Sequence, residues 1–147
     1  MFGTEEAARI IIRELADVPA VTAVIGSRIR FSPIYPGDLA HPGALVYPAF
    51  TQYDGPIDTD GTPTYERVDM EVRFIDKGAS ANTIRAAAKA ALGALAGISG
   101  LSEVIDGVTW FVTFTATAEA GPPHLLDESS VYRQLGTVYS VEFHRGG

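Results

Sequence analysis

The side chains of this chain that could do acid–base or metal chemistry are, first, its three histidines. His41, His124 and His144 fall in loops or at the end of a strand, without the His-x-x-x-His or His-Glu-x-x-His spacing that places two imidazoles on one helix face. The chain also contains neither a Gly-x-Ser-x-Gly turn for a serine nucleophile nor a Gly-x-x-x-x-Gly-Lys-Ser/Thr loop for phosphate. The sequence therefore predicts solvated or interfacial histidines and no nucleotide hydrolysis.

Three aspartates raise the question of a cation site. Asp54, Asp58 and Asp60 precede a glycine, and hard cations bind where several oxygens converge on a sharp turn. The spacing does not fit an EF-hand loop, because it would put Pro56 at the first ligand position and Arg67 at the last, and neither supplies a carboxylate. A bound ion and a solvated acidic hairpin tip both stay open for this loop, and we expect no metal ion or other cofactor elsewhere.

Composition limits the possible functions further. The chain has no cysteine, which excludes disulfides, thiol nucleophiles and thiolate metal sites and fits a reducing compartment. Eleven Lys and Arg against 18 Asp and Glu give a net charge of −7, which argues against gripping a phosphate backbone, because such binding needs clustered positive charge. If copies formed a ring, the same charge would keep DNA from sticking as it moved through the hole.

Length and hydropathy predict one domain, residues 1–147, with a substantial core. No apolar run approaches the ~20 residues that a membrane-spanning helix requires. Glu5 and Glu6 stand where a secretory signal would be basic, so we expect synthesis in the cytoplasm.

Aromatic residues near the end of the chain could form a stacking platform for single-stranded nucleic acid. The segment around Trp110, Phe111 and Phe114 offers no Lys or Arg to follow phosphates, however. We therefore expect these three side chains in the core or in a contact between subunits.

Helices are expected in three places. Thr4 is the expected N-cap of a helix over residues 5–16, and a proline at the start with a glycine just past the end delimits a short helix, Pro19–Ile25. Ser80 is expected to cap a third helix over residues 81–95. Its apolar stripe comprises Ile84, Ala87, Ala88, Ala91, Leu92 and Leu95.

Alternating or aromatic segments predict the strands, which run over residues 28–31, 44–53, 65–76, 108–118 and 131–144. The proline-rich stretch from Ser32 to Pro48 is expected to be an ordered loop or a sheet edge, because proline cannot donate to a central ladder. Asp106-Gly107 is a strong signal for a two-residue hairpin turn. The connections 54–63 and 119–130 exceed the usual loop length, and we expect them to be arms that order against another subunit.

The strand over residues 65–76 has the clearest pattern. Val68–Phe74 alternates apolar residues with Asp69, Glu71 and Arg73, so one face meets the core and the other meets water or a partner. The outward row is expected to be either an exposed sheet face or a charged seam between subunits. On either interpretation, Arg73→Glu should leave the fold unchanged, with association as the property to test.

The order of helix, short helix, strands, long helix and strands predicts an α+β fold. We expect a two-layer sandwich in which two principal helices pack on one face of a mainly antiparallel sheet. This arrangement covers the single apolar face of every element.

The segment Asp17–Ile29, which follows an amphipathic helix, resembles the opening of the tail terminator, or tail completion, proteins of long-tailed bacteriophages and related prophage elements. The downstream pattern is similar as well, with a proline-containing approach over residues 41–48, an acidic alternating strand ending at Asp76, an alanine-rich helix over residues 84–95 and a closing aromatic strand. The resemblance spans essentially the whole chain.

The resemblance implies a structural virion protein with no enzymatic activity. A homo-oligomeric ring, a hexamer in this family, would cap the tail tube, terminate its growth and offer a surface for joining the DNA-filled head. The expected partners are the tail tube protein and the head–neck connector proteins, with DNA passing through the lumen without specific binding and no membrane involved. Segments 54–63 and 119–130 look longer than expected for the family, so the arms that meet neighbours are expected to differ here.

The candidate residues for the subunit interface are Asp58, Asp60, Asp69, Glu71, Arg73, His124 and Asp127. Two alternatives to a tail terminator stay open. One is another neck component, such as a head-completion or connector protein. The other is a small hydrolase or ligand-binding protein, which would use His124 together with Asp127 or Glu128.

Overall fold

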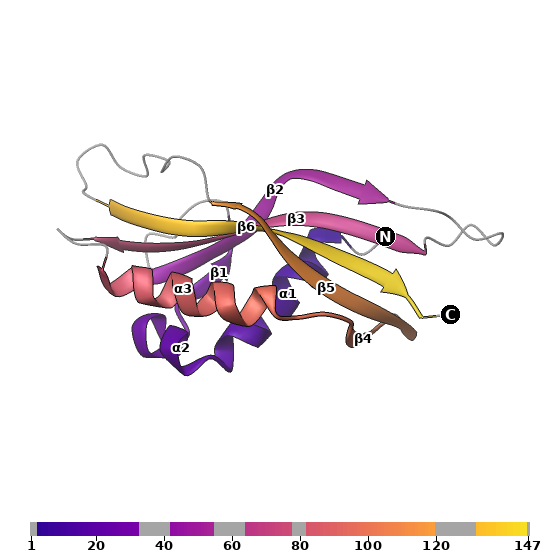
Figure 1. Cartoon of the computed structure of the whole chain (residues 1–147), viewed down its shortest axis with the longest axis horizontal. Coiled ribbons are helices and arrows are strands. Elements are labelled where there is room, and N and C mark those ends of the chain that lie inside the picture. The colour runs from indigo at the N-terminus through magenta and orange to yellow at the C-terminus, as the bar shows by residue number, and fades with distance from the viewer. Residues whose placement is uncertain (1–2, 33–41, 55–63, 78–81, 120–131, 147) are drawn as a thin grey trace.

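A curled six-stranded sheet with helices on one side organises the described part of the chain, in a computed structural model (Figure 1). The structure describes residues 3–32, 42–54, 64–77, 82–119 and 132–146. Within these ranges the chain has three helices and a mixed α+β fold, as the sequence predicted. None of the described helices combines the length and the hydropathy needed to cross a bilayer.

The helices form close to their predicted positions. They are α1 (Gly3–Ala16), α2 (Pro19–Ile25) and α3 (Asn82–Ala96). Thr4 lies inside the first turn of α1 and is not its N-cap, so that prediction is wrong. Gly26 ends α2 as expected: it has a φ of 57° and donates its backbone N–H to the Thr22 carbonyl at 2.8 Å. The predicted cap at Ser80 lies outside the described residues.

The strands are β1 (Ile29–Phe31), β2 (Gly43–Asp54), β3 (Tyr65–Lys77), β4 (Leu101–Ile105), β5 (Val108–Glu119) and β6 (Tyr132–Arg145). Their order across the sheet is β1-β2-β3-β6-β5-β4. β1 pairs with β2 in parallel, and all other described pairs are antiparallel. β1 and β4 therefore lie at opposite edges of the described sheet.

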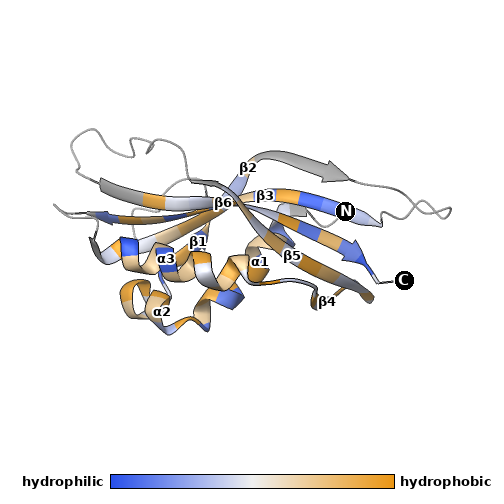
Figure 2. Ribbon diagram, viewed as in Figure 1, coloured by the Kyte–Doolittle hydropathy of each residue, from blue (hydrophilic) through white to orange (hydrophobic). Residues whose placement is uncertain are grey.

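The main core lies between the helices and the sheet. α1 contacts β2 and β3, α3 contacts β3, β5 and β6, and the short α2 packs on α3. Figure 2 shows hydrophobic residues along α2, α3 and β5. Tyr139 lies in this core against Phe114, with ring centroids 6.3 Å apart, and burial raises the pKa of Tyr139 to about 12. The inward residues predicted for β3 are all buried: Val68, Met70, Val72 and Phe74.

The predicted stripe of α3 holds with one exception. Ile84, Ala87, Ala91 and Leu95 are buried and Ala88 is half-buried, whereas Leu92 is 37% exposed. α3 packs on the sheet and on α2, which is only two turns long. These neighbours cover a narrower part of the helix surface than its apolar residues occupy, so Leu92 stays exposed.

Pro48 lies inside β2, within the strand that the sequence predicted over residues 44–53 and at a point where β2 is an edge of the described sheet. β1 pairs with residues 44–46 of β2 only, so β2 has no neighbour on that side at Pro48 in the described sheet. The missing N–H of Pro48 therefore leaves no ladder bond unmade, and the β2–β3 register shifts between Pro48 and Gln52.

The predicted hairpin at Asp106-Gly107 is present and joins β4 to β5. Both residues have positive φ, 50° for Asp106 and 78° for Gly107, as a two-residue turn of this type requires. The turn fixes the pairing of Ile105 with Val108 and so the position of β4 at the sheet edge.

Candidate functional site

The predicted interface residues fall into two groups. Asp69, Glu71 and Arg73 lie on β3, on the face of the sheet opposite the helices. Asp58, Asp60, His124 and Asp127 lie outside the described residues, as do His41 and Glu128. The interface that joins both groups therefore stays a prediction.

Glu71 and Arg73 are buried within the single chain, whereas the sequence predicted an exposed sheet face or a charged seam between subunits. Arg73 is 3% and Glu71 8% exposed in the single chain. Arg73 donates Nε to the Tyr47 hydroxyl at 3.0 Å and Nη2 to Glu71 Oε2 at 3.2 Å. The sequence pattern could not reveal this, because alternation identifies the face on which a side chain lies but not what covers that face.

Part of the surroundings of this pair is apolar. Leu45, Tyr47 and Ile75 form a second small buried cluster, and the strand register places it on the same face as Arg73. The prediction that Arg73→Glu leaves the fold unchanged is not compatible with this burial, since it would put a second carboxylate beside Glu71 in an apolar setting.

The sheet face opposite the helices has a second part, around Arg67 and His144, that is exposed to solvent. We call it the open half. Here Arg67 donates Nε to Asp69 Oδ1 at 3.1 Å, and the Arg67 side chain is 42% exposed. Tyr65 and His144 lie side by side on β3 and β6, with ring centroids 5.0 Å apart, and His144 Nε2 lies 3.4 Å from Glu142 Oε2. His144 is exposed, as expected for a solvated histidine.

The open half reaches the β4 edge of the sheet. Val104 is 67% and Phe111 41% exposed, whereas Trp110 and Phe114 point to the core and are buried. Of the three aromatic residues considered from sequence, two are therefore core residues and Phe111 is a surface residue. Asp106 lies exposed at the β4–β5 turn next to this apolar pair.

An ion cluster links β4 to α1. The Glu103 carboxylate, which is almost buried, faces the guanidinium groups of Arg13 and Arg9, with Arg9 Nη2 at 3.4 Å from Glu103 Oε2. The hydrogen bond from Arg13, and then that from Arg9, holds the pKa of Glu103 below its ordinary value. β4 is thus tied to α1 by charge as well as by its hairpin to β5.

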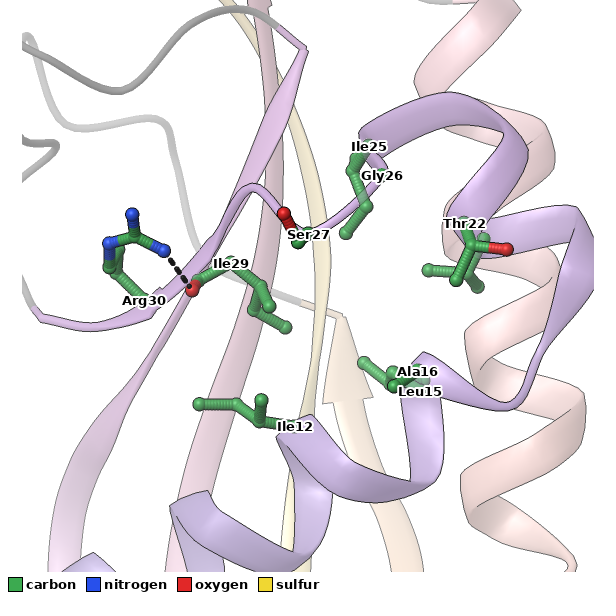
Figure 3. Close-up of a pocket in the computed structure, with 10 residues that line it drawn as sticks. Ile12, Leu15, Ala16, Thr22, Ile25, Gly26, Ser27, Ile29 and Arg30 are labelled. Carbon is green, nitrogen blue, oxygen red and sulfur yellow. Dashed lines mark hydrogen bonds between the residues drawn. The ribbon is translucent and has the colours of Figure 1, made fainter.

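A cleft of about 500 Å³ opens where α1, α2 and β1 meet (Figure 3). Its walls are mainly apolar and include Ile12, Leu15, Val21, Ile25 and Ile29, with Ala16, Thr22, Gly26, Ser27 and Arg30. Arg30 lies at the rim, where Nη1 donates to the Ile29 carbonyl at 3.0 Å.

The residues of this cleft all belong to one stretch of sequence, yet its existence could not be read from them. The proline and glycine that delimit α2 predict a tight helix–helix–strand connection, which forms. A cleft is the space that these elements leave between them, and the sequence carries no direct signal for it.

Within the described ranges, no group of three or more His, Cys, Asp and Glu side chains could hold a metal ion. A scan against protein-family models returns no match, and a search of curated proteins returns none.

Proposed function

We propose that this chain is a structural protein of a phage virion, a tail terminator. Its copies form a ring, a hexamer by the resemblance, which caps the tail tube, ends its growth and presents the surface to which the head is joined. The proposal includes a two-layer sandwich as the subunit architecture, and it includes no enzymatic activity and no cofactor.

The observation that carries the proposal is the order of elements. The family resemblance rests on a helix, a short proline-started helix, strands, an alanine-rich helix and closing strands, and the chain has α1, α2, β1–β3, α3 and β4–β6 in that order. The tight connection between α1 and β1, which begins the resemblance, has Pro19 at its first helical turn and Gly26 at its end.

The charge of the chain supports the same role. A net charge of −7 per subunit, summed around a ring, gives an assembly whose overall negative potential repels the phosphate backbone of passing DNA. The apolar residues Val104 and Phe111 at the β4 edge give a surface suited to protein contacts, because scattered charge alone rarely holds a stable interface.

The test is the mass of the purified protein by light scattering over a wide range of concentration, alone and with isolated tail tubes, followed by negative-stain images. We expect ring-shaped oligomers, or assembly on the ends of the tubes. A protein that stays monomeric and does not bind tubes contradicts the proposal. Localisation of the subunit on filled heads but not on tails would instead identify another neck component.

The cleft favours a second candidate, a protein that binds an apolar ligand. Its volume and apolar walls suit a small molecule. An apolar fluorescent probe should then bind the wild type, bind less after Ala16→Trp, which fills the cleft, and bind normally after Ala23→Trp, since Ala23 is exposed on α2 but does not line the cleft.

A further inference from the structure

Two apolar surface features lie at opposite edges of the described sheet. The cleft is bounded by β1, which is one edge strand, and the exposed pair Val104 and Phe111 lies on β4 and β5 at the other edge. In Figure 1 the β4 end and the α2 end of the molecule lie far apart along its long axis. A single copy therefore cannot place its own Val104 in its own cleft.

Both features are apolar, and one of them is a cavity. The cleft is concave, with Ile12, Leu15 and Ile29 among its walls. At the β4 edge, Val104 is the most exposed large hydrophobic side chain among the described residues, at 67%. Contact between them would remove apolar surface on both sides from water, which is the main driving force of protein association.

The charges beside the two features are opposite. Arg30 lies at the rim of the cleft, and the exposed Asp106 lies at the turn that follows Val104. Glu103 on β4 also carries a negative charge, but it faces Arg9 and Arg13 of its own chain. Asp106 is therefore the carboxylate of this hairpin that is available to a second copy. This arrangement favours one orientation of approach, β4 edge to cleft.

We propose that the β4–β5 edge of one copy, led by Val104 and Phe111, docks in the α1–α2–β1 cleft of the next copy. The contact is head-to-tail, since it joins two different surfaces, and such a contact closes into a ring when its rotation fits and otherwise gives a filament. The inference rests on the proposed ring and names the surfaces that build it.

The absence of cysteine from the chain allows a direct test by cross-linking. Ala16→Cys places a thiol in the wall of the cleft, and Val104→Cys places one at the β4 edge. Both native side chains are exposed. The two single variants of the full chain are mixed and treated with a short bismaleimide. We expect a cross-linked dimer from the mixture and none from either variant alone. Thr115→Cys on β5 and Ala23→Cys on α2, both exposed, replace Val104→Cys and Ala16→Cys in turn as controls and should not cross-link.

Light scattering on the same samples separates the two proposals. Oligomers without the 16–104 cross-link, or with equal cross-linking of the control pairs, overturn the docking surfaces and leave the ring intact. Cross-linking of Val104→Cys with itself shows an edge-to-edge contact and also overturns the inference. An apolar probe that still binds the cleft in the oligomer overturns it too, because the docked edge would occupy the cleft. Monomers at every concentration contradict the ring and the docking together.

A charge substitution gives a second measurement. Val104→Glu should weaken self-association by about tenfold or more, because it moves a carboxylate into an apolar cleft. Thr115→Glu adds the same charge to the same sheet face away from the edge and should leave association within about twofold of the wild type. Equal effects of the two variants would overturn the inference.

Discussion

The buried Arg73–Glu71 pair provides the sharpest test of how the outer face of the sheet is built. We consider Arg73→Met, which keeps most of the apolar length of the side chain and removes the guanidinium. The variant leaves the Glu71 carboxylate, which is 8% exposed, without its cation, and it leaves the Tyr47 hydroxyl without the donor at 3.0 Å.

Removing one partner of a buried ion pair costs about 3–5 kcal/mol, because the remaining charge stays desolvated. This is a large part of the 5–15 kcal/mol by which a domain is usually stable. The same substitution at Arg67 is a matched control, since Arg67 lies on the same strand and face and pairs with Asp69, but with a side chain that is 42% exposed. An exposed pair of this kind contributes less than about 1 kcal/mol.

The assay is urea denaturation followed by circular dichroism. Arg73→Met should lower the urea midpoint by at least about 1 M, whereas Arg67→Met should change it little. The double variant Arg73→Met/Glu71→Gln should recover part of the loss, because it removes the uncompensated charge. Equal stabilities of Arg73→Met and Arg67→Met, or a double variant less stable than Arg73→Met, would refute the reasoning.

Four further substitutions concern the core, two glycines in or next to the helices, and the ion cluster. Val72→Asp should abolish folding, seen as loss of the folded dichroism spectrum, because it puts an unpaired charge in the core; a soluble, folded variant would contradict this. Gly26→Ala should lower the free energy of unfolding by about 1–3 kcal/mol, since a φ of 57° with ψ −125° is accessible only to glycine. Gly93 lies inside α3, where an added Cβ would meet open space, so Gly93→Ala should raise the free energy of unfolding by about 0.5–1 kcal/mol in the same denaturation assay. The lowered pKa of Glu103 means that its contribution is present above the ordinary carboxyl pKa of about 4.3 and is lost as pH falls through the lower folded value. Glu103→Gln should therefore flatten the acid side of the stability–pH profile, and an unchanged slope would show that Arg13 and Arg9 do not stabilise the ionised form.

Local features were predictable because they depend on residues close together in the chain. Proline at the first turn of α2 and glycine after its end act within one helical turn, and both ends form where predicted. The alternation in β3 places Val68, Met70, Val72 and Phe74 on one face whatever the neighbouring strands are. Element boundaries were less certain, as the start of α1 at Gly3 shows.

The surfaces were less predictable than the elements. Arg73 and Leu92 were placed from the pattern of their own strand or helix alone. Arg73 was expected on an exposed sheet face or in a seam between subunits and is buried within the single chain, whereas Leu92, expected in the apolar stripe of α3, is 37% exposed. In each case the outcome depends on what packs against the side chain, and that partner comes from a distant part of the sequence. Phe111 and Trp110 are adjacent aromatic residues that point to opposite faces of β5, and the sequence left both as core or contact residues.

The sequence by itself determined the charge of the chain, the absence of thiols, the limits of α2, the two faces of β3 and the β4–β5 turn, since each depends on composition or on neighbouring residues. The tertiary structure alone decided the strand order, the burial of Glu71 and Arg73, and the placement of the cleft and Val104 at opposite sheet edges. The physical reason is that burial and concavity belong to elements brought together over long separations, and no short-range pattern specifies which elements meet.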